Sequence, residues 1–306
     1  MFGFLNVAKP PGMTSHDVVA VIRRALRQQG RGDVKVGHAG TLDPMATGVL
    51  VVCVGGATRL SEYVMAHTKQ YRAAMVFGIE TDTYDADGTI TARVPANALT
   101  RTEIEHAAMQ LTGDIDQIPP MHSAIKVGGR KLYDIARSGQ SIDRAPRRVT
   151  IERIDVLDFT VDDGAGTATA AVDVTCSAGT YIRSIAHDLG GLLGTGAHLS
   201  ALERTASGRF KLEDATPLET LKAEPDWRPY LIAPLDALAD MPRVTLSPEN
   251  AAHLAHGRAI PADIPDGVTA AAIYAGELAA IVTAQGSAWH PHKVFLHSEA
   301  SDPLKR

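Results

Sequence analysis

Residues 37–48 concentrate the residue types that could carry out chemistry. Three glycines and Pro44 surround a single carboxylate, Asp43. A segment this rich in turn formers displays one acidic side chain on a shaped backbone, and a carboxylate displayed in this way can act as a nucleophile or as a general base. Taken alone, the pattern also fits a turn in which Asp43 simply precedes Pro44.

Several other kinds of catalytic or metal site are disfavoured because their sequence motifs are missing. The sequence contains no P-loop, no G-x-G-x-x-G, no G-x-S-x-G and no H-E-x-x-H motif, which argues against nucleotide hydrolysis and dinucleotide redox chemistry. The segment His290-Pro291-His292 is interpreted as a loop with two exposed imidazoles rather than as a metal site.

An acidic cluster, Asp82, Asp85 and Asp87, precedes Gly88 and superficially matches a calcium-binding loop. With Gly88 in the sixth place, the first and twelfth places fall on Thr83 and Val94, which are poor ligands. A turn stabilised by Asp side chains is therefore favoured. A metal-dependent hydrolase built on the three carboxylates stays open as an alternative.

Composition and length predict an ordinary globular protein. The chain has 306 residues, of which 45% are hydrophobic and 21% charged, so one large domain with a small appendage is expected. Cys53 and Cys176 lie in apolar runs and are predicted to be buried thiols. No stretch approaches the ~20 apolar residues of a membrane span, and residues 1–10 do not resemble a signal peptide, so a cytoplasmic location is expected.

Charge is unevenly distributed along the chain. Residues 1–210 contain 22 basic and 22 acidic residues, whereas residues 211–306 contain 8 and 13, so the last third carries the whole net charge of −5. A basic strip, residues 122–153, holds eight basic residues against three acidic ones: Lys126, Arg130, Lys131, Arg137, Arg144, Arg147, Arg148 and Arg153. It is either a solvated face or a contact surface for a phosphate backbone.

The elements that must position these residues do not alternate strictly between strand and helix. Hydrophobic periodicity predicts helices at about residues 16–29, 58–67, 100–111 and 181–193, and strands at 49–54, 71–79, 149–161 and 167–176. This order favours an α+β fold with a mixed, mainly antiparallel sheet and flanking helices. After Pro242, the sequence predicts a helix at 248–256 and strands at 270–274, 278–283 and 294–296. We therefore expect a catalytic domain over residues 1–240 and a small β-rich domain over residues 241–306.

Several motifs occur in an order that resembles one known family. The chain is similar to the TruB-type tRNA pseudouridine synthases across residues 9–208. The matching motifs are Lys9-Pro10-x-Gly12-x-Thr14-Ser15, Gly37-His38-x-Gly40-x-Leu42-Asp43-Pro44-x-Ala46-Thr47-Gly48, Lys69-x-Tyr71-Arg72, Thr81-Asp82-Thr83-x-Asp85-x-x-Gly88, Pro119-Pro120-x-x-Ser123-Ala124-Ile125-Lys126, Gly179-Thr180-Tyr181-Ile182-Arg183-Ser184, and Ala197-His198-Leu199 with Leu202, Arg204 and Gly208.

The resemblance implies isomerisation of the T-loop uridine of tRNA, at the position conventionally numbered 55, to pseudouridine. It implies a pseudouridine synthase-like fold followed by a PUA-like domain, with no metal, nucleotide or organic cofactor. Asp43 is then the catalytic carboxylate. The expected substrate-binding residues are His38, Tyr71, Tyr181, Arg183 and Leu202.

Each of these residues has an expected role. Arg183 would keep Asp43 ionised and aimed, and Tyr71 and Leu202 would line a pocket for the uracil. His38 would fill the gap left by the extruded base, and Tyr181 would add a nucleotide contact.

The expected partner is tRNA, bound through its T-arm. No membrane and no obligate protein partner are implied, and a monomer is expected. Beside the metal-dependent hydrolase, a second alternative is an RNA-binding or tRNA-folding module that lacks catalysis, and the intact Asp43 argues against it.

Overall fold

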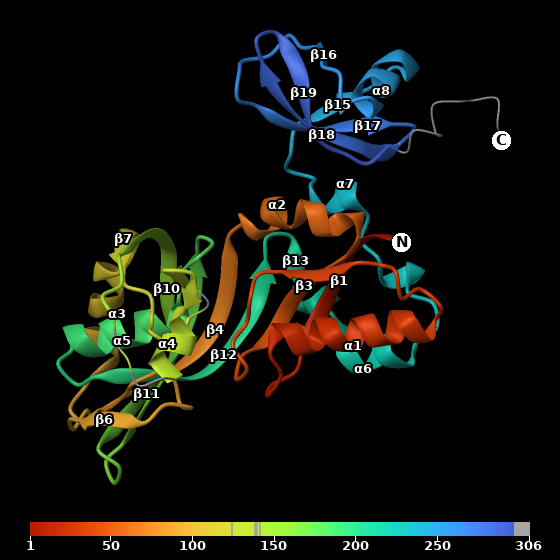
Figure 1. Cartoon of the computed structure of the whole chain (residues 1–306). Coiled ribbons are helices and arrows are strands. Elements are labelled where there is room, and N and C mark those ends of the chain that lie inside the picture. Colours follow the sequence, from red (N-terminus) through yellow and green to blue (C-terminus); the bar gives the residue numbers. More distant parts are fainter. Residues whose placement is uncertain (124, 138–139, 141, 297–306) are drawn as a thin grey trace.

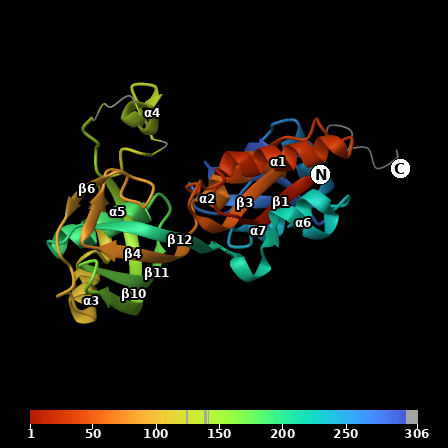
Figure 2. The ribbon, with the colours of Figure 1, turned by 90° about the horizontal axis from the view of Figure 1, so that it is seen from below.

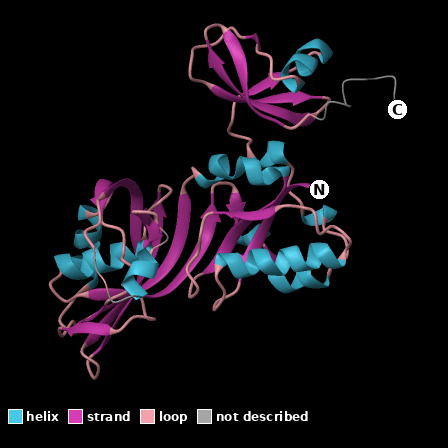
Figure 3. Ribbon diagram, in the orientation of Figure 1, coloured by secondary structure: helices cyan, strands magenta, loops and turns pink. Residues whose placement is uncertain are grey.

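Two β-sheets organise the chain. The structure is a computed structural model and describes residues 1–123, 125–137, 140 and 142–296. A ten-stranded sheet occupies the larger, N-terminal part, and a five-stranded sheet occupies the C-terminal part (Figure 1). Coloured by secondary structure, the larger sheet carries most of the helices (Figure 3). Within the described residues, no helix has the length and apolar character required to cross a lipid bilayer.

The larger sheet is mixed and mainly antiparallel, which confirms the expected fold class. Among the described residues, two of its pairings are parallel, β1 with β14 and β12 with β3. Eight of its strands lie side by side in the order β14 (Thr216–Pro217), β1 (Phe2–Lys9), β3 (Thr47–Gly55), β12 (Ala197–Ser207), β4 (Lys69–Phe77), β11 (Thr167–Cys176), β10 (Arg147–Asp162) and β7 (Gly113–Gln117). Two further strands pair beside this row: β13 (Phe210–Lys211) pairs with β12, and β2 (Val36–Ala39) pairs with β3.

Helices pack against both halves of this sheet. They are α1 (Ser15–Gln28), α2 (Ser61–Met65), α3 (Arg101–Gln110), α4 (Leu132–Arg137), α5 (Ile182–Leu192), α6 (Leu218–Ala223) and α7 (Pro234–Ala237), with 3-10 turns η1 (Gly56–Leu60), η2 (Leu212–Asp214) and η3 (Arg228–Tyr230). Helix α1 lies over β1 and β3, whereas α3 and α5 lie with β4, β10 and β11 in the other half (Figure 2). Two small hairpins, β5 (Ile79–Thr81) with β6 (Ile90–Arg93) and β8 (Lys126–Val127) with β9 (Arg130–Lys131), complete this part.

The predicted helices are largely confirmed. Thr14 and Thr100 cap α1 and α3 in reciprocal capping boxes with Asp17 and Glu103, so each helix begins where a side chain satisfies its free amides. The expected helix at 58–67 is instead split into η1 and the short α2. Thr58 and Ser61 donate their hydroxyls to backbone carbonyls three residues earlier, and these local bonds favour a tighter turn.

The five-stranded sheet confirms the expected β-rich tail. Its order is β15 (Arg243–Thr245), β17 (Thr269–Tyr274), β18 (Glu277–Gln285), β19 (Ala288–Val294) and β16 (Ile260–Pro261), with α8 (Pro248–Ala255) beside it. Two details of the prediction are wrong. The segment His290-Pro291-His292 lies inside β19 rather than in a loop, and the expected strand at 294–296 begins where β19 ends. Pro291 is tolerated because it sits at an irregularity of the pairing with β18.

The two parts of the chain share a contact surface. Phe2 of β1 stacks on Phe295 with ring centroids 5.0 Å apart, and Arg59 donates to the carbonyl of Val294 at 2.7 Å. We propose a domain boundary between residues 240 and 241, immediately before the first strand of the smaller sheet. Cys53 and Cys176 are both buried and free, as predicted, and burial raises the pKa of their thiols to about 12 and about 11.

Candidate active site

Asp43 lies on the connection between β2 and β3, and the start of α1 holds this connection in place. The Ser15 hydroxyl accepts from the amide of Leu42 at 2.8 Å and donates to its carbonyl at 3.1 Å. The Leu42 side chain is buried, and the amide of Gly12 donates to the carbonyl of Pro44 at 2.8 Å. The backbone on both sides of Asp43 is therefore fixed, while its side chain remains 33% exposed.

Arg183 from α5 grips the Asp43 carboxylate. Its Nε lies 2.9 Å from Oδ2, and its Nη2 donates to Oδ1 at 3.2 Å. The Arg183 side chain is 5% exposed although it belongs to a helix. A guanidinium fork facing both carboxylate oxygens fixes the direction of the carboxylate as well as its charge. The structure thus brings together the two predicted residues on which the expected chemistry depends.

The other side of Arg183 is held by Asp85, a residue that the sequence analysis considered only as part of the acidic cluster and not as a partner of Arg183. Arg183 Nη1 lies 3.1 Å from Asp85 Oδ2 and donates to the carbonyl of Thr83 at 3.1 Å, while Nη2 donates to the carbonyl of His122 at 2.8 Å. Asp85 is itself buried. The guanidinium is therefore bracketed between two carboxylates, one buried and one partly exposed.

Asp85 belongs to a turn, as the acidic cluster predicted. Its Oδ1 accepts from the Thr83 hydroxyl at 2.6 Å and from the amide of Asp87 at 3.1 Å, whereas Asp82 accepts from the amide of Thr89 at 2.8 Å. The carboxylates of Asp82 and Asp85 thus serve separate backbone and side-chain partners. Within the described residues, no group of three potential metal ligands converges here or elsewhere.

The environment shifts the pKa of Asp43 upward. Burial is the main cause, and the charge of Asp85 adds to it, while Arg183 opposes both. Arg183 therefore favours the ionised form in surroundings that otherwise disfavour it. A carboxylate with a raised pKa is also a stronger base than an exposed aspartate.

Two buried cations hold the backbone of the Asp43 loop. Lys9, at the end of β1, donates its ammonium to the carbonyls of Ala46 at 2.6 Å, Pro44 at 3.2 Å and Pro10 at 3.0 Å. Burial lowers the pKa of Lys9 to about 8. Lys9 was recognised only as part of a motif, and nothing in its own sequence context indicates burial.

Arg204 on β12 also donates to carbonyls of this loop. It donates to the carbonyls of Val49 at 2.7 Å and Gly40 at 3.1 Å, and its side chain is 1% exposed. The backbones approach so closely that a Cβ on Gly48 would lie 2.3 Å from the carbonyl oxygen of Arg204. Gly48, with φ +95°, is therefore required where the loop enters β3.

Tyr71 and Leu202 lie on neighbouring strands beside the loop. In the antiparallel pairing of β4 with β12, Tyr71 faces Arg204 and Leu202 faces Ala73. Both side chains are 8% exposed and share an apolar cluster with Leu42. Burial raises the pKa of the Tyr71 hydroxyl, so this group is protonated at neutral pH. Asp43 lies within electrostatic range of the Tyr71 hydroxyl, and Leu202 belongs to the same apolar cluster as Tyr71.

Tyr181 precedes the first turn of α5, two residues before Arg183. The side-chain amide of Gln117 fixes its backbone, accepting from the amide of Tyr181 at 2.8 Å and donating to its carbonyl at 3.0 Å. Burial raises the pKa of the Tyr181 hydroxyl, and the charges of Asp43 and Arg183 contribute smaller opposing effects. Tyr181 therefore lies within electrostatic range of the Asp43–Arg183 pair.

His38 lies on β2, at the end that leads into the loop. Burial, reinforced by the charge of Arg204, lowers the pKa of its imidazole. Its Nδ1 is buried and has no hydrogen-bond partner among the described residues. His38 makes no side-chain hydrogen bond or ion pair with the other predicted site residues in the part of the chain that the structure describes.

The structure describes the side chains of only part of the basic strip, residues 122–153. The side chains of Lys126, Arg130, Lys131 and Arg137 lie outside the described part of the structure. Of the others, Arg148 lies 3.6 Å from Asp116 and Arg153 lies 2.7 Å from Asp155. These two residues form exposed ion pairs, which is the behaviour of a solvated face.

Comparison with known proteins agrees with the geometry. Residues 23–182 match the family model "TruB family pseudouridylate synthase (N terminal domain)", residues 183–239 match "tRNA pseudouridylate synthase B C-terminal domain", and residues 241–296 match "tRNA Pseudouridine synthase II, C terminal". The tRNA pseudouridine synthase B of Symbiobacterium thermophilum is 52% identical over 255 residues, which cover 83% of this chain and 82% of that protein. The same-named protein of Dehalococcoides mccartyi is 42% identical over 302 residues, covering 97% of each chain.

Solved structures share the fold. A chain of a Cbf5-Nop10-Gar1 complex superposes with a TM-score of 0.74 at 30% identity, covering 99% of this chain and 88% of that one. A chain of an H/ACA RNP bound to a substrate RNA containing 2'-deoxyuridine gives a TM-score of 0.72 at 27% identity, covering 97% of this chain and 86% of that one. From these matches and from its fold, the chain belongs to the TruB family of pseudouridylate synthases and is an isomerase.

Proposed function

We propose that this enzyme converts the uridine at position 55, in the T-loop of tRNA, into pseudouridine. The bond from N1 of uracil to C1′ of the ribose breaks, and a bond from C5 to C1′ forms. C5 loses its proton and N1 gains one, so the product is an isomer and no co-reactant is consumed. The relatives named tRNA pseudouridine synthase B support tRNA as the substrate.

The Asp43–Arg183 pair is the observation that carries the proposal. Attack on the uracil ring and attack on C1′ both require an ionised carboxylate that points in one direction. Arg183 contacts both oxygens of Asp43, and Asp85 and two backbone carbonyls hold Arg183. The pair is thus set before substrate arrives, which is what positional and electrostatic catalysis require.

Base flipping accounts for the remaining predicted residues. A uridine stacked within a folded loop cannot reach Asp43, so it must leave the stack. In this proposal the base stacks on the ring of Tyr71 against Leu202, and Tyr181 adds a contact from α5. The low pKa of His38 keeps its imidazole neutral at neutral pH, and a neutral flat ring suits the gap that the base leaves in the RNA.

The proposal extends to the organisation of the molecule. Residues 241–306 would form the PUA-like domain, and residues 1–240 would hold the whole catalytic apparatus. The enzyme would act on tRNA in the cytoplasm, as a monomer. In the basic strip, Arg147 would face the RNA backbone, since it is exposed and forms no ion pair among the described residues, whereas Arg144 is partly buried and donates to the carbonyl of Pro119 at 3.1 Å.

A tritium-release assay tests the proposal. A tRNA transcript labelled with tritium at C5 of uridine should release one tritium for each uridine converted, at equal rates with and without a chelator. A matched transcript in which position 55 is cytidine should release none. Equal release from the two transcripts would refute the proposed position, and loss of release in the chelator would indicate a metal-dependent reaction.

A further inference from the structure

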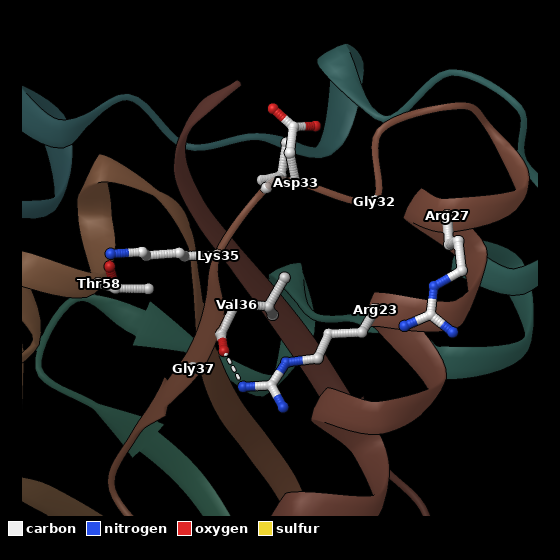
Figure 4. A pocket seen from close by; sticks show the side chains of 9 residues that line it. Arg23, Arg27, Gly32, Asp33, Lys35, Val36, Gly37 and Thr58 are labelled. Carbon is white, nitrogen blue, oxygen red and sulfur yellow. Dashed lines mark hydrogen bonds between the residues drawn. The ribbon is translucent and has the colours of Figure 1, made fainter.

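A basic pocket lies between α1, β2 and η1, away from the Asp43–Arg183 pair. Its volume is about 470 Å³, and the residues that supply its polar side chains are Arg23, Arg27, Asp33, Lys35 and Thr58. In Figure 4 the two arginines project from α1 on one side, while Lys35 and Thr58 lie on the other. A volume of this size is within the ~300–1,000 Å³ of ordinary ligand pockets.

The charges of this pocket are unbalanced. Arg23, Arg27 and Lys35 face a single carboxylate, Asp33, and all four residues are exposed. Arg23 uses one nitrogen to donate to the carbonyl of Val36 at 2.6 Å, which fixes its guanidinium against the start of β2. None of the three cations forms an ion pair within the described part of the chain. Such a set of donors suits an anion with several oxygens.

The position of the pocket connects it to both functional parts of the molecule. Val36, at its floor, is two residues before His38 on the same strand, roughly 7 Å along the backbone. Thr58, on its opposite wall, precedes Arg59, whose guanidinium donates to Val294 and lies 4.8 Å from the centre of the Phe295 ring. A polymer passing from the active site toward the C-terminal sheet would therefore cross this pocket.

We infer that this pocket binds a phosphate of the RNA backbone. The inference rests on the proposed function, because it takes RNA as the ligand. No aromatic ring occurs among the residues that line the pocket, so it offers charge and hydrogen bonds but no surface on which a base could stack. Contacts of this kind set the register of a nucleic acid without reading its sequence. The pocket thus holds the backbone while His38 and the Asp43 loop engage the T-loop.

The test compares variants that remove charge inside and outside the pocket. Arg27→Gln with Lys35→Gln removes two exposed cations and leaves Arg23 and its bond to Val36 in place. Arg24→Gln with Arg93→Gln is the matched control, since both residues are exposed, neither forms an ion pair among the described residues and neither lines the pocket. Binding of a full-length tRNA transcript is measured as a function of salt for the full chain and both double variants.

The expected result is a loss of affinity confined to the pocket variant. Losing the one phosphate contact should lower the slope of log K against log salt by about 1 in magnitude and weaken binding by about 10-fold at low salt. The tritium-release rate at saturating tRNA should stay unchanged. Equal affinities and slopes for the two double variants would overturn the inference, and so would equal losses in both.

A second measurement locates the phosphate. Replacing single phosphates of the tRNA by uncharged methylphosphonates should reveal one linkage whose replacement weakens the wild type but has no further effect on Arg27→Gln with Lys35→Gln. If every replacement weakens both proteins equally, the pocket binds no backbone phosphate. Tritium release by the wild type is scored separately, so failure of the proposed function is distinguishable from failure of this inference.

Discussion

The larger sheet buries charged side chains, whereas the smaller sheet is packed from apolar ones. Lys9, Lys69, Arg183 and Arg204 are all less than 6% exposed, and Asp85, a buried carboxylate, pairs with Arg183. Among the described residues after Ser207, every buried side chain is apolar. The five-stranded sheet is filled largely by small residues such as those at 270–272 and 279–280, together with Trp289 on β19.

This difference separates residues that support the fold from residues that support a reaction. Burying an ion costs several kcal/mol unless partners compensate for the lost water. In the larger sheet, Lys9, Arg183 and Arg204 all contact the loop that carries Asp43. We infer that these charges are kept because they position one carboxylate. The smaller sheet has no such group to position, and its interior is accordingly apolar.

Replacing the guanidinium of Arg183 should strongly reduce kcat. In Arg183→Lys the charge remains, but a single ammonium cannot contact both oxygens of Asp43 and also reach Asp85. We expect kcat to fall by about 10²-fold, because misplacement of a catalytic group by about 1 Å has effects of this size. Single-turnover tritium release measures the change, with tRNA affinity as the control. A normal rate would show that the fork is unnecessary.

Removing the ammonium of Lys9 should affect both the rate and the fold. Lys9→Met removes a buried donor from the carbonyls of Pro10, Pro44 and Ala46, of which Pro44 keeps the amide of Gly12. The loss costs about 1–3 kcal/mol of unfolding free energy, and it frees the loop that carries Asp43. We expect kcat to fall by about 10-fold. Urea unfolding and turnover are both measured, and Lys222→Met, at an exposed ion pair, is the control. Lost stability with full activity would mean that Lys9 serves the fold alone.

The pH dependence reports the balance of charge around Asp43. Asp43 must be ionised, and burial raises its pKa above the usual 3.8, so kcat/KM should fall on the acid side at a pH above that value. Asp85 contributes to the raised pKa. In Asp85→Asn the fall of kcat/KM on the acid side should therefore move to lower pH. The maximum rate should also be lower, because Arg183 is held less firmly. A fall on the acid side that stays in place, or that moves upward, would contradict the assigned charge balance.

The contact between the two sheets should matter least for the reaction. Phe295→Ala removes the stack on Phe2 and the contact with Arg59, which costs about 0.5–1.5 kcal/mol beyond the lost burial. We expect a lower melting temperature and an unchanged kcat at saturating tRNA. A large fall in kcat would show that the smaller sheet takes part in positioning the active site, and the contrast between the two regions would fail.

The sequence predicted those features that depend on local pattern. Hydrophobic periodicity located the helix α3 and the strands β3, β10 and β11. The place of Asp43 came from the motifs of a family rather than from spacing alone. The error at His290-Pro291-His292 has a tertiary cause, since pairing with β18 imposes a strand on a segment whose composition is typical of a loop.

The remaining features were not visible in the sequence because they depend on distant contacts. Lys9 is buried by carbonyls up to 37 residues away, and Arg204 by carbonyls more than 150 residues away. A charged residue in a strand or helix is ordinarily exposed, so nothing local distinguishes these two from surface cations. The pocket beside α1 was missed for a related reason, because Lys35 and Thr58 join Arg23 and Arg27 only in the folded chain.

The most direct test of the account is the single-turnover rate of C5 tritium release by Asp43→Asn, measured beside its affinity for the same tRNA. Asparagine keeps the shape of the side chain but lacks the charge that Arg183 holds in place. The account predicts that release falls by at least about 10³-fold while tRNA binding is retained. Release near the wild-type rate would contradict the assignment of Asp43 as the catalytic group.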